Sequence, residues 1–190
     1  MTAPRVRRGD RHERSAGPFP SKLSPLGGQR STQRGKRGGS GMSLPLADAL
    51  RICHLHNAAL KGALQAAQLP ISAPQLRAAS AERVRALDQA VLRYLKLQDT
   101  MGEHVLRSFV VEVLEEPMED KPMLDLLNRL ERLGYLATDD WLATRLLRNQ
   151  LTHDYPEDPA RQAEVLNRLP TMQRLIEDLM ARIEAQRGPP

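Results

Sequence analysis

Residues 81–116 read AERVRALDQAVLRYLKLQDTMGEHVLRSFVVEVLEE, a long amphipathic segment. Its apolar side chains recur every three or four residues, as they do on an α-helix with one buried face. The spacing predicts one long amphipathic helix from about Ala81 to Glu116, ending before Pro117. Its buried stripe is expected to contain Val84, Leu87, Val91, Leu95, Met101, Val105, Phe109 and Val113.

Helical spacing continues on both sides of this stretch, and no segment alternates as a β-strand does. Prolines and a glycine mark the helix ends. Gly134 is placed as a left-handed C-cap, Asp158 and Pro159 form a helix start, and Pro170 should kink or split the helix that follows. The sequence predicts an all-α fold, an antiparallel bundle of four to five main helices. The expected helices cover 45–68, 81–116, 123–133, 138 to just after His153, and 158–187.

Composition limits the chemistry that the chain can carry. Aromatic residues make up 3% of the 190 residues, so the core must be aliphatic. The single cysteine, Cys53, excludes an internal disulfide and predicts a reduced, cytoplasmic setting. No apolar run approaches the roughly 18–20 residues of a membrane span, and the basic N-terminus does not resemble a signal peptide.

The net charge of +5 is unevenly distributed. Residues 1–41 carry ten Lys and Arg against two Asp and Glu, whereas the rest of the chain carries 18 basic and 21 acidic residues. The first segment has almost no aliphatic content and is expected to be a disordered basic tail, followed by a mildly acidic domain over 44–187. Arg37-Gly38-Gly39 precedes Met42 as a translated ribosome-binding site would, so we expect Met42 to be the true start. A basic arm that binds nucleic acid is the alternative interpretation of the tail.

One short run carries residue types suited to catalysis, Arg148-Asn149-Gln150-Leu151-Thr152-His153-Asp154-Tyr155. Arginine presents a planar fork of donors to a phosphate, and histidine exchanges protons near neutral pH. Arg148 and His153 are five residues apart, so on a regular helix they point about 140° away from each other. If both act on one phosphate, the helix is distorted or two copies of the chain supply the site, which favours a homodimer. The structural alternative is that the helix dipole alone favours an Arg and a His near a C-terminus.

The pattern of Arg148, Asn149, His153 and Tyr155 resembles the Arg-Asn-x-x-x-His-x-Tyr signature of HEPN-domain proteins, in particular their HepT branch. Residues 127–136 with Trp141, and residues 97–102, also resemble that branch. The resemblance covers roughly 44–187 and leaves the tail outside.

This resemblance implies a HEPN-like bundle and the toxin of a toxin–antitoxin pair, a metal-independent endoribonuclease without a cofactor. Arg148 and His153 would be catalytic at a homodimer cleft, Asn149 would support them, and RNA would be the substrate. The partner would be a minimal nucleotidyltransferase antitoxin that silences the toxin by adenylylating Tyr155. Two alternatives remain open: a non-catalytic subunit that presents substrate to such a nucleotidyltransferase, and an all-α interaction module without either activity.

Other candidate residues favour structural roles. Cys53, His54 and His56 are too tightly spaced on one helix to converge on a metal ion, so no metal site is expected. Asp99 lies in the family-like stretch, and two interpretations stay open: a helix-surface acid, which is the default, or a residue that faces the cleft. His104 and Trp141 are expected to pack, and the acids of residues 115–120 to form a solvated loop.

Overall fold

The computed structural model describes residues 44–118, 120–152 and 158–187, and every regular element in these ranges is helical. The predicted all-α class is confirmed. Residues 1–41 and Met42, for which a disordered tail and a later start were predicted, lie outside the described residues. In chain order the helices are α1 (Leu46–Ala67), α2 (Ala73–Arg77), α3 (Ala81–Thr100), the π-helix η1 (Met101–Val105), α4 (Leu106–Glu112), α5 (Met123–Arg132), α6 (Thr138–Leu151), α7 (Pro159–Asn167) and α8 (Leu169–Arg187).

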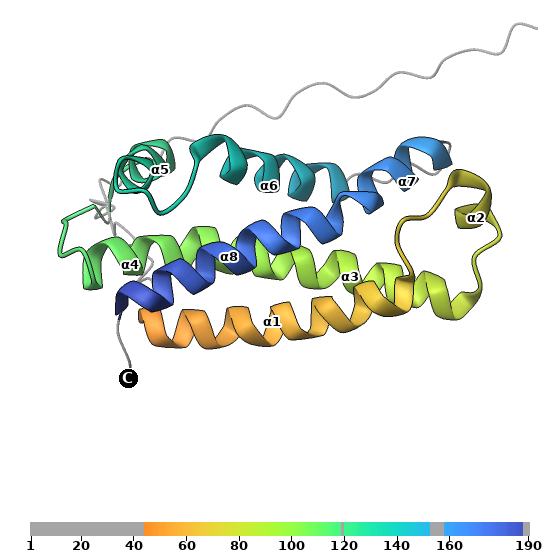
Figure 1. The fold of residues 1–190 in the computed structure, drawn as a ribbon, viewed down its shortest axis with the longest axis horizontal. Helices are drawn as coiled ribbons and strands as arrows, with labels where there is room; N and C mark the ends of the chain where they lie inside the picture. The colour runs from red at the N-terminus through yellow and green to blue at the C-terminus, as the bar shows by residue number, and fades with distance from the viewer. Residues whose placement is uncertain (1–43, 119, 153–157, 188–190) are drawn as a thin grey trace, which may run out of the picture. The chain divides into compact units, whose positions relative to one another are not determined.

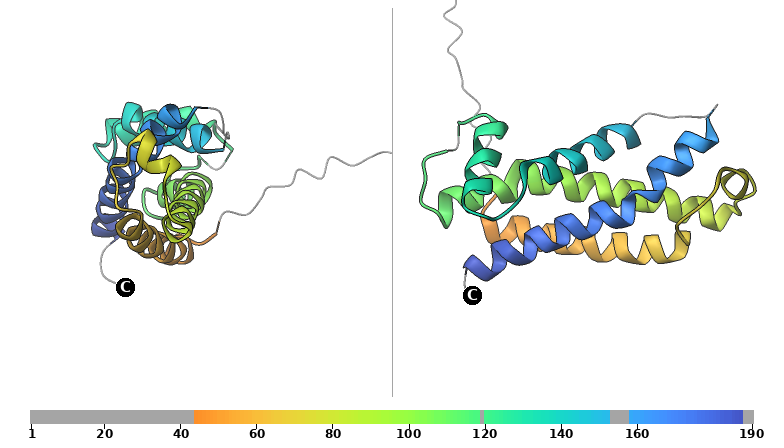
Figure 2. Two further views of the ribbon diagram at one scale, coloured as in Figure 1. Left: turned by 90° about the vertical axis from the view of Figure 1, so that its right-hand side faces the viewer. Right: turned by 45° about the horizontal axis from the view of Figure 1, so that its top comes forward.

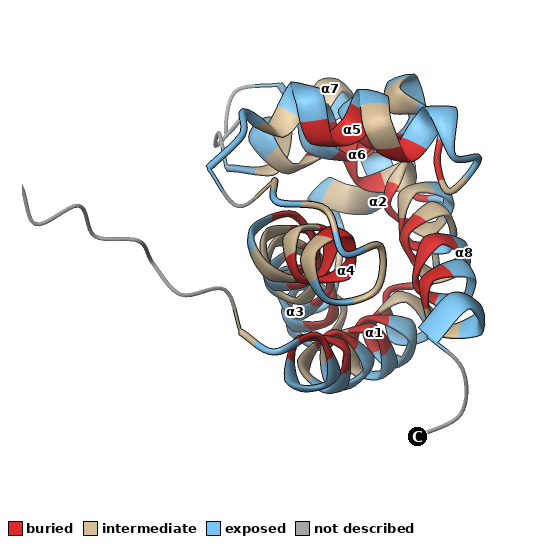
Figure 3. Ribbon diagram, turned by 90° about the vertical axis from the view of Figure 1, so that its left-hand side faces the viewer, coloured by how far each residue is buried: buried red, intermediate tan, exposed pale blue. Residues whose placement is uncertain are grey.

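Helix α3 is the central element, with α1 packed along one side of it and α6 near its other side (Figure 1). Helix α8 contacts α1, α3 and α6, so the apolar faces of four helices meet between them. Figure 3 shows this arrangement end-on, with the buried residues turned inward on α1, α3 and α8. The two further views in Figure 2 show α6 and α1 on opposite sides of α3. Helix α3 is therefore placed to contribute side chains to both neighbours.

The predicted helix over 81–116 forms, but its end and its regularity differ from the prediction. It runs as α3, η1 and α4 and stops at Glu112. In η1 the backbone N–H of Leu106 donates to the carbonyl of Met101, five residues earlier. A π turn holds one more residue than an α turn, so it shifts the helix faces that precede it relative to those that follow.

The predicted stripe is only partly right before η1 and mostly right from η1 onward. Val84 is exposed, and Val91 and Leu95 are only half-buried. Leu87, Met101, Val105 and Phe109 are buried as predicted, and Val113 is half-buried. Missing from the predicted stripe are the buried residues Ala86, Ala90, Tyr94, Leu97 and Gln98.

Most of the predicted boundaries are confirmed. Gly134 has a φ of +80°, the left-handed conformation expected of a C-cap. Asp158 accepts a hydrogen bond from the backbone of Arg161 and caps α7, with Pro159 in the first turn. The chain is divided into α7 and α8 just before Pro170. Helix α2 was not predicted, because Pro70 and Pro74 were taken as a break.

Helix α2 nevertheless has a sequence signal. Ser72 and Gln75 form a capping box, in which each side chain accepts a hydrogen bond from the other residue's backbone N–H. Pro74 occupies the first turn, where its missing N–H costs nothing. Asn167 fixes the preceding segment, since its side chain accepts from the N–H of Ile71 and donates to the carbonyl of the same residue.

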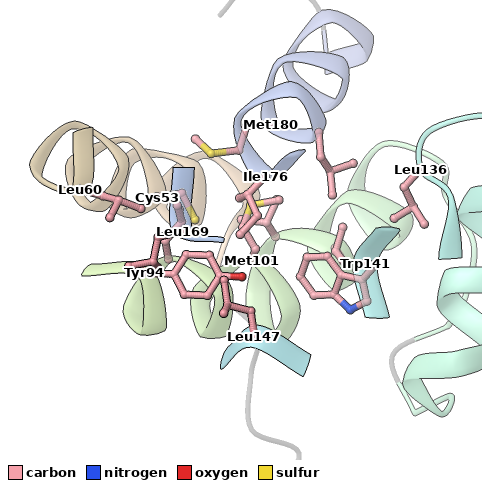
Figure 4. Packing of buried hydrophobic residues seen from close by; sticks show 14 of the residues in the cluster. Cys53, Leu60, Tyr94, Met101, Leu136, Trp141, Leu147, Leu169, Ile176 and Met180 are labelled. Atoms are coloured by element: carbon pink, nitrogen blue, oxygen red, sulfur yellow. The ribbon is translucent and has the colours of Figure 1, made fainter. Parts of the chain in front are cut away.

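The core is aliphatic with few aromatic rings, as the composition predicts. Figure 4 shows Tyr94, Met101 and Leu147 close to Leu169 and Ile176. Tyr94 is fully buried, and its hydroxyl donates to the carbonyl of Thr144 over 2.8 Å. Burial raises the pKa of Tyr94 well above the normal range, so the phenol stays protonated as the donor of this bond. The bond joins α3 to α6 at the level of the candidate site.

Replacing Tyr94 by Phe should lower the free energy of unfolding by about 1 kcal/mol, because it removes one buried hydrogen bond and keeps the ring. Urea unfolding monitored by circular dichroism measures the change. Tyr135→Phe is the matched control, since the half-buried Tyr135 packs its ring on Phe109 at a centroid distance of 4.9 Å. Equal stability of the Tyr94→Phe and wild-type proteins would show that this bond does not stabilise the fold.

None of the helices that the structure describes combines the length and the apolar character needed to cross a membrane.

Candidate functional site

Arg148 lies in the last turn of α6, facing α3. Helix α6 begins with three polar residues, Thr138, Asp139 and Asp140, and acidic groups there are favoured by the helix dipole. The Glu131 carboxylate accepts from both the backbone N–H and the hydroxyl of Thr138, which fixes the start of the helix. Trp141, Thr144 and Leu147 are buried, so the face that contains Arg148 is held at the edge of the core.

The guanidinium of Arg148 is bound by the carboxylate of Asp99 on α3. Its Nε donates to Oδ1 at 3.0 Å and its Nη2 donates to Oδ2 at 3.3 Å, so each carboxylate oxygen accepts one hydrogen bond. Both side chains are 34% exposed. The hydrogen bond to Asp99 raises the pKa of Arg148, burial lowers it, and the charges of Asp99 and Glu103 raise it further. Arg148 is therefore a fixed and permanently charged group at the surface.

A polar cleft with a volume of about 390 Å³ opens beside this ion pair. Its lining has two acidic residues, Asp99 and Glu103. It also has three basic residues, Arg107, Arg145 and Arg148, so the net charge of the lining is positive. The three arginines would attract an anionic ligand, and repulsion from the two acids would limit where in the cleft it binds. The full lining is Gln98, Asp99, Gly102, Glu103, Arg107, Met123, Trp141, Arg145, Arg148 and Asn149.

The floor of the cleft depends on Gly102 in η1. A Cβ atom built on Gly102 would lie 3.1 Å from Cζ2 of Trp141, closer than nearly all real Cβ contacts. The indole of Trp141 can therefore lie directly against the backbone of η1 because residue 102 has no side chain. π-Helical turns often occur at functional sites, and here one shapes the wall of the cleft. The helical spacing of residues 81–116 does not predict this turn, although a glycine in the middle of a long helix was a signal for it.

Two of the four predicted site residues are in the described ranges. Arg148 and Asn149 both line the cleft. Asn149 is exposed, and its carbonyl accepts from the N–H and the hydroxyl of Thr152, the residue that caps α6. His153 and Tyr155 lie outside the described residues. Helix α6 ends at Leu151, close to the expected end just after His153.

The structure adds Asp99 to the candidate site. A surface acid was its default interpretation and a place facing the cleft was the alternative. The alternative is right, because its carboxylate is the partner of Arg148 and lines the cleft. Glu103 and Arg145 also line the cleft and were not singled out. Their signal was weak, because the cleft joins two helices whose contacting residues are 49 positions apart in the sequence.

The cysteine and the histidines of α1 have separate surroundings. Cys53 is buried, and burial raises the pKa of its thiol to about 12. His54 contacts the Glu184 carboxylate on α8, and His56 faces Arg93 on α3. Among the described residues no three His, Cys, Asp or Glu side chains are grouped so as to hold a metal ion.

One smaller prediction needs correction, and another gains a contact. His104, expected to pack, is half-buried, and its Nδ1 also accepts a hydrogen bond from the backbone N–H of Leu44. Glu116 was placed in a solvated loop, yet its carboxylate binds the guanidinium of Arg129 on α5. The hydrogen bond from Arg129 lowers the pKa of Glu116. Trp141 is buried, as predicted.

Fold and cleft together define an all-helical protein with an arginine–carboxylate pair at the edge of a polar cleft. No family model, curated protein or solved structure matches the chain.

Proposed function

We propose that the protein is a metal-independent endoribonuclease of the HEPN type, with Arg148 as its phosphate-binding residue and His153 as its proton-transfer residue. One observation carries the proposal: the guanidinium of Arg148 lines a net-positive cleft and is held there by Asp99. Arg148 precedes His153 by five residues in the sequence. The resemblance of the Arg148–Tyr155 run to the HEPN signature supplies the reaction class.

The reaction needs a base, an acid and a group that stabilises charge on phosphorus oxygens. His153 would accept the proton of the RNA 2′-hydroxyl as its oxygen forms a bond to phosphorus. The bond from phosphorus to the 5′-oxygen then breaks, and a protonated histidine supplies the proton that this leaving oxygen takes up. The products are a 2′,3′-cyclic phosphate and a free 5′-hydroxyl. Arg148 would stabilise the negative charge that builds on the non-bridging oxygens during the transfer.

Asp99 would act as a positioning residue for Arg148. An arginine side chain has many rotamers, and a carboxylate that accepts two hydrogen bonds selects one of them. Replacing Asp99 by Asn should slow cleavage roughly 10- to 100-fold, because misplacement by about 1 Å is costly at a reacting centre. The affinity for RNA should stay the same or increase, since the substitution removes a negative charge from the cleft.

Single-turnover cleavage and equilibrium RNA binding separate these two effects for Asp99→Asn. Asp88→Asn is the matched control, because Asp88 is an exposed acid on the same helix outside the cleft. If Asp99→Asn cleaves at the wild-type rate, Asp99 does not position Arg148.

The proposed homodimer is supported by the surface next to the cleft. Leu142 and Leu146 are 42% and 52% exposed, and they lie on the face of α6 that also carries Arg145 and Asn149. Exposed leucines in a row on one helix often mark a protein interface. A second copy packed against this face would bring two copies of the motif to one cleft, which is one of the two arrangements that the spacing of Arg148 and His153 allows.

Leu146→Glu should convert the dimer to a monomer and abolish detectable cleavage at concentrations where the wild-type protein is active. The substitution places two like charges at the two-fold interface, and the exposed position makes the monomer's fold tolerant of it. Light scattering after size exclusion measures the mass. Leu55→Glu is the control, since Leu55 is a 61% exposed leucine on α1. A Leu146→Glu variant that remains dimeric and active would exclude this face as the interface.

The second candidate function is a non-catalytic subunit that binds a minimal nucleotidyltransferase and presents substrate to it. One observation favours it: Asp99 neutralises Arg148, and Glu103 adds another negative charge beside them. Expression in bacteria separates the two functions. A ribonuclease toxin should arrest growth and degrade RNA unless its nucleotidyltransferase partner is co-expressed, and Tyr155 should then carry AMP. Normal growth with the chain alone, together with co-purification of the partner, would favour the subunit.

A further inference from the structure

Seven arginines in the described ranges are half-buried, and Arg93 differs from the other six in what its guanidinium contacts. Six of the seven direct a guanidinium nitrogen to an oxygen, either a carbonyl, a side-chain amide or a carboxylate, which satisfies the buried charge. Arg93 on α3 is the exception, because its contact is a ring nitrogen. The other six are Arg83 to Ala67 and Gln68, Arg107 to Lys121, Arg129 to Glu116, Arg148 to Asp99, Arg161 to Glu164 and Arg168 to Gln150.

Arg93 faces α1, where its Nη1 lies 3.4 Å from Nδ1 of His56. Its Nε is fully buried and has no hydrogen-bond partner in the described part of the chain. An arginine can only donate, so Nδ1 of His56 accepts and the ring carries its hydrogen on Nε2. Burial lowers the pKa of His56, and the charges of Arg93 and Lys96 lower it further, which keeps the ring neutral. His56 can therefore offer an N–H while the positive charges lie beside it.

Lys96 follows Arg93 by one turn of α3 and is exposed. The ion pairs found among the described residues include neither Arg93, Lys96 nor His56. Two cations and a neutral imidazole thus lie close together, and none of the three has an ion-pair partner among the described residues. A partly desolvated cation without a counter-ion is unfavourable, so a bound anion would stabilise this arrangement.

We propose that Arg93, Lys96 and His56 form a subsite for a phosphate group. A phosphate has several oxygens that accept from different directions, and arginine and lysine are the side chains that bind it most often. The subsite lies on the side of α3 that faces α1, about six residues or roughly 9 Å along the helix from Asp99. Lys96 and Asp99, three residues apart, lie on neighbouring positions of the exposed face.

The subsite and the Arg148 cleft lie on different sides of α3, so an RNA strand with its scissile phosphate at Arg148 would cross the face with Lys96 and Asp99 to place a second phosphate in the subsite. The RNA assignment rests on the proposed function. The phosphate subsite itself does not, because it is carried by Arg93, Lys96 and His56 alone.

The test compares Arg93→Ala with Arg85→Ala in the full chain. Arg85 is an exposed arginine on the same helix, so both variants lose one positive charge. Inorganic phosphate is titrated at constant pH and ionic strength while NMR follows the His56 ring. The ring signals should shift in a saturable manner in the wild-type protein and in Arg85→Ala, and should not shift in Arg93→Ala. Lys96→Ala, at an exposed position that cannot disturb folding, should weaken the phosphate affinity.

The second measurement is binding of a single-stranded RNA oligonucleotide as a function of salt. Arg93→Ala should lower the affinity several-fold more than Arg85→Ala and reduce the slope of log K against log salt by about 0.7 more. That result assigns the subsite to the RNA backbone. A phosphate effect without an RNA effect assigns it to a small phosphorylated ligand. If the protein binds no RNA but phosphate still shifts His56, the proposed function fails and the subsite stands. Equal behaviour of Arg93→Ala and Arg85→Ala in both titrations overturns the subsite.

Discussion

Replacing Arg148 by Ala should slow RNA cleavage by about 10²- to 10³-fold, the loss seen when one donor to a developing oxyanion is removed. The effect should be on the chemical step, because the guanidinium stabilises charge that grows as the bond to the leaving oxygen breaks. The fold should be retained. The ion pair with Asp99 is a third exposed, and pairs of this kind contribute only about 0–1 kcal/mol to stability.

Arg145→Ala is the matched control for Arg148→Ala. Arg145 lines the same cleft one turn earlier on α6 and is exposed, so its loss removes the same charge from the same surface. It should weaken RNA binding without a comparable loss of the single-turnover rate. Arg148→Lys should be intermediate, since it keeps the charge and loses the planar fork. Equal single-turnover rates for Arg145→Ala and Arg148→Ala would mean that Arg148 provides only general electrostatic attraction.

Replacing His153 by Ala should reduce cleavage by about 10²- to 10⁴-fold, the usual contribution of a proton-transfer group. RNA affinity should change little, because a neutral imidazole adds little to the attraction for phosphates. Single-turnover rates and filter binding measure the two quantities. His54→Ala is the control, since His54 lies on α1 and contacts Glu184 on α8. A His153→Ala protein with wild-type activity would remove the ribonuclease proposal.

The fold class and most helix boundaries were predictable, because they depend on local signals. Gly134 needs a left-handed backbone, Asp158 caps a helix, and Pro170 lacks the N–H that a continuous helix would use. Each of these effects is determined within a few residues. They are therefore readable from the sequence without knowledge of what packs against the helix.

The buried face of α3 was not predictable in the same way. The predicted stripe follows one helical spacing from Val84 to Val113. The π turn η1 interrupts that spacing, so one stripe does not fit both sides of the turn: Met101, Val105 and Phe109 are buried, whereas Val84 is exposed. A preference for Val and Leu also hid Ala90 and Tyr94, although a small side chain and a buried ring fill the interface between helices equally well.

The candidate site was predictable only on one of its two helices. The sequence run identified Arg148 and Asn149, which line the cleft. Asp99 and Glu103 reach the same cleft from a helix 49 and 45 positions earlier, and their approach depends on the glycine contact between Gly102 and Trp141. Such a long-range contact has no local signal in a single sequence.

The chemistry of the cut ends tests whether the protein is a metal-independent ribonuclease. The full-length protein is incubated with a defined single-stranded RNA in excess EDTA, and the fragments are analysed by mass spectrometry. We expect fragments with a 2′,3′-cyclic phosphate at one end and a 5′-hydroxyl at the other, and none with the Arg148→Ala or His153→Ala proteins. Intact RNA in EDTA, or cleavage that requires Mg²⁺ and leaves a 3′-hydroxyl, would contradict the account.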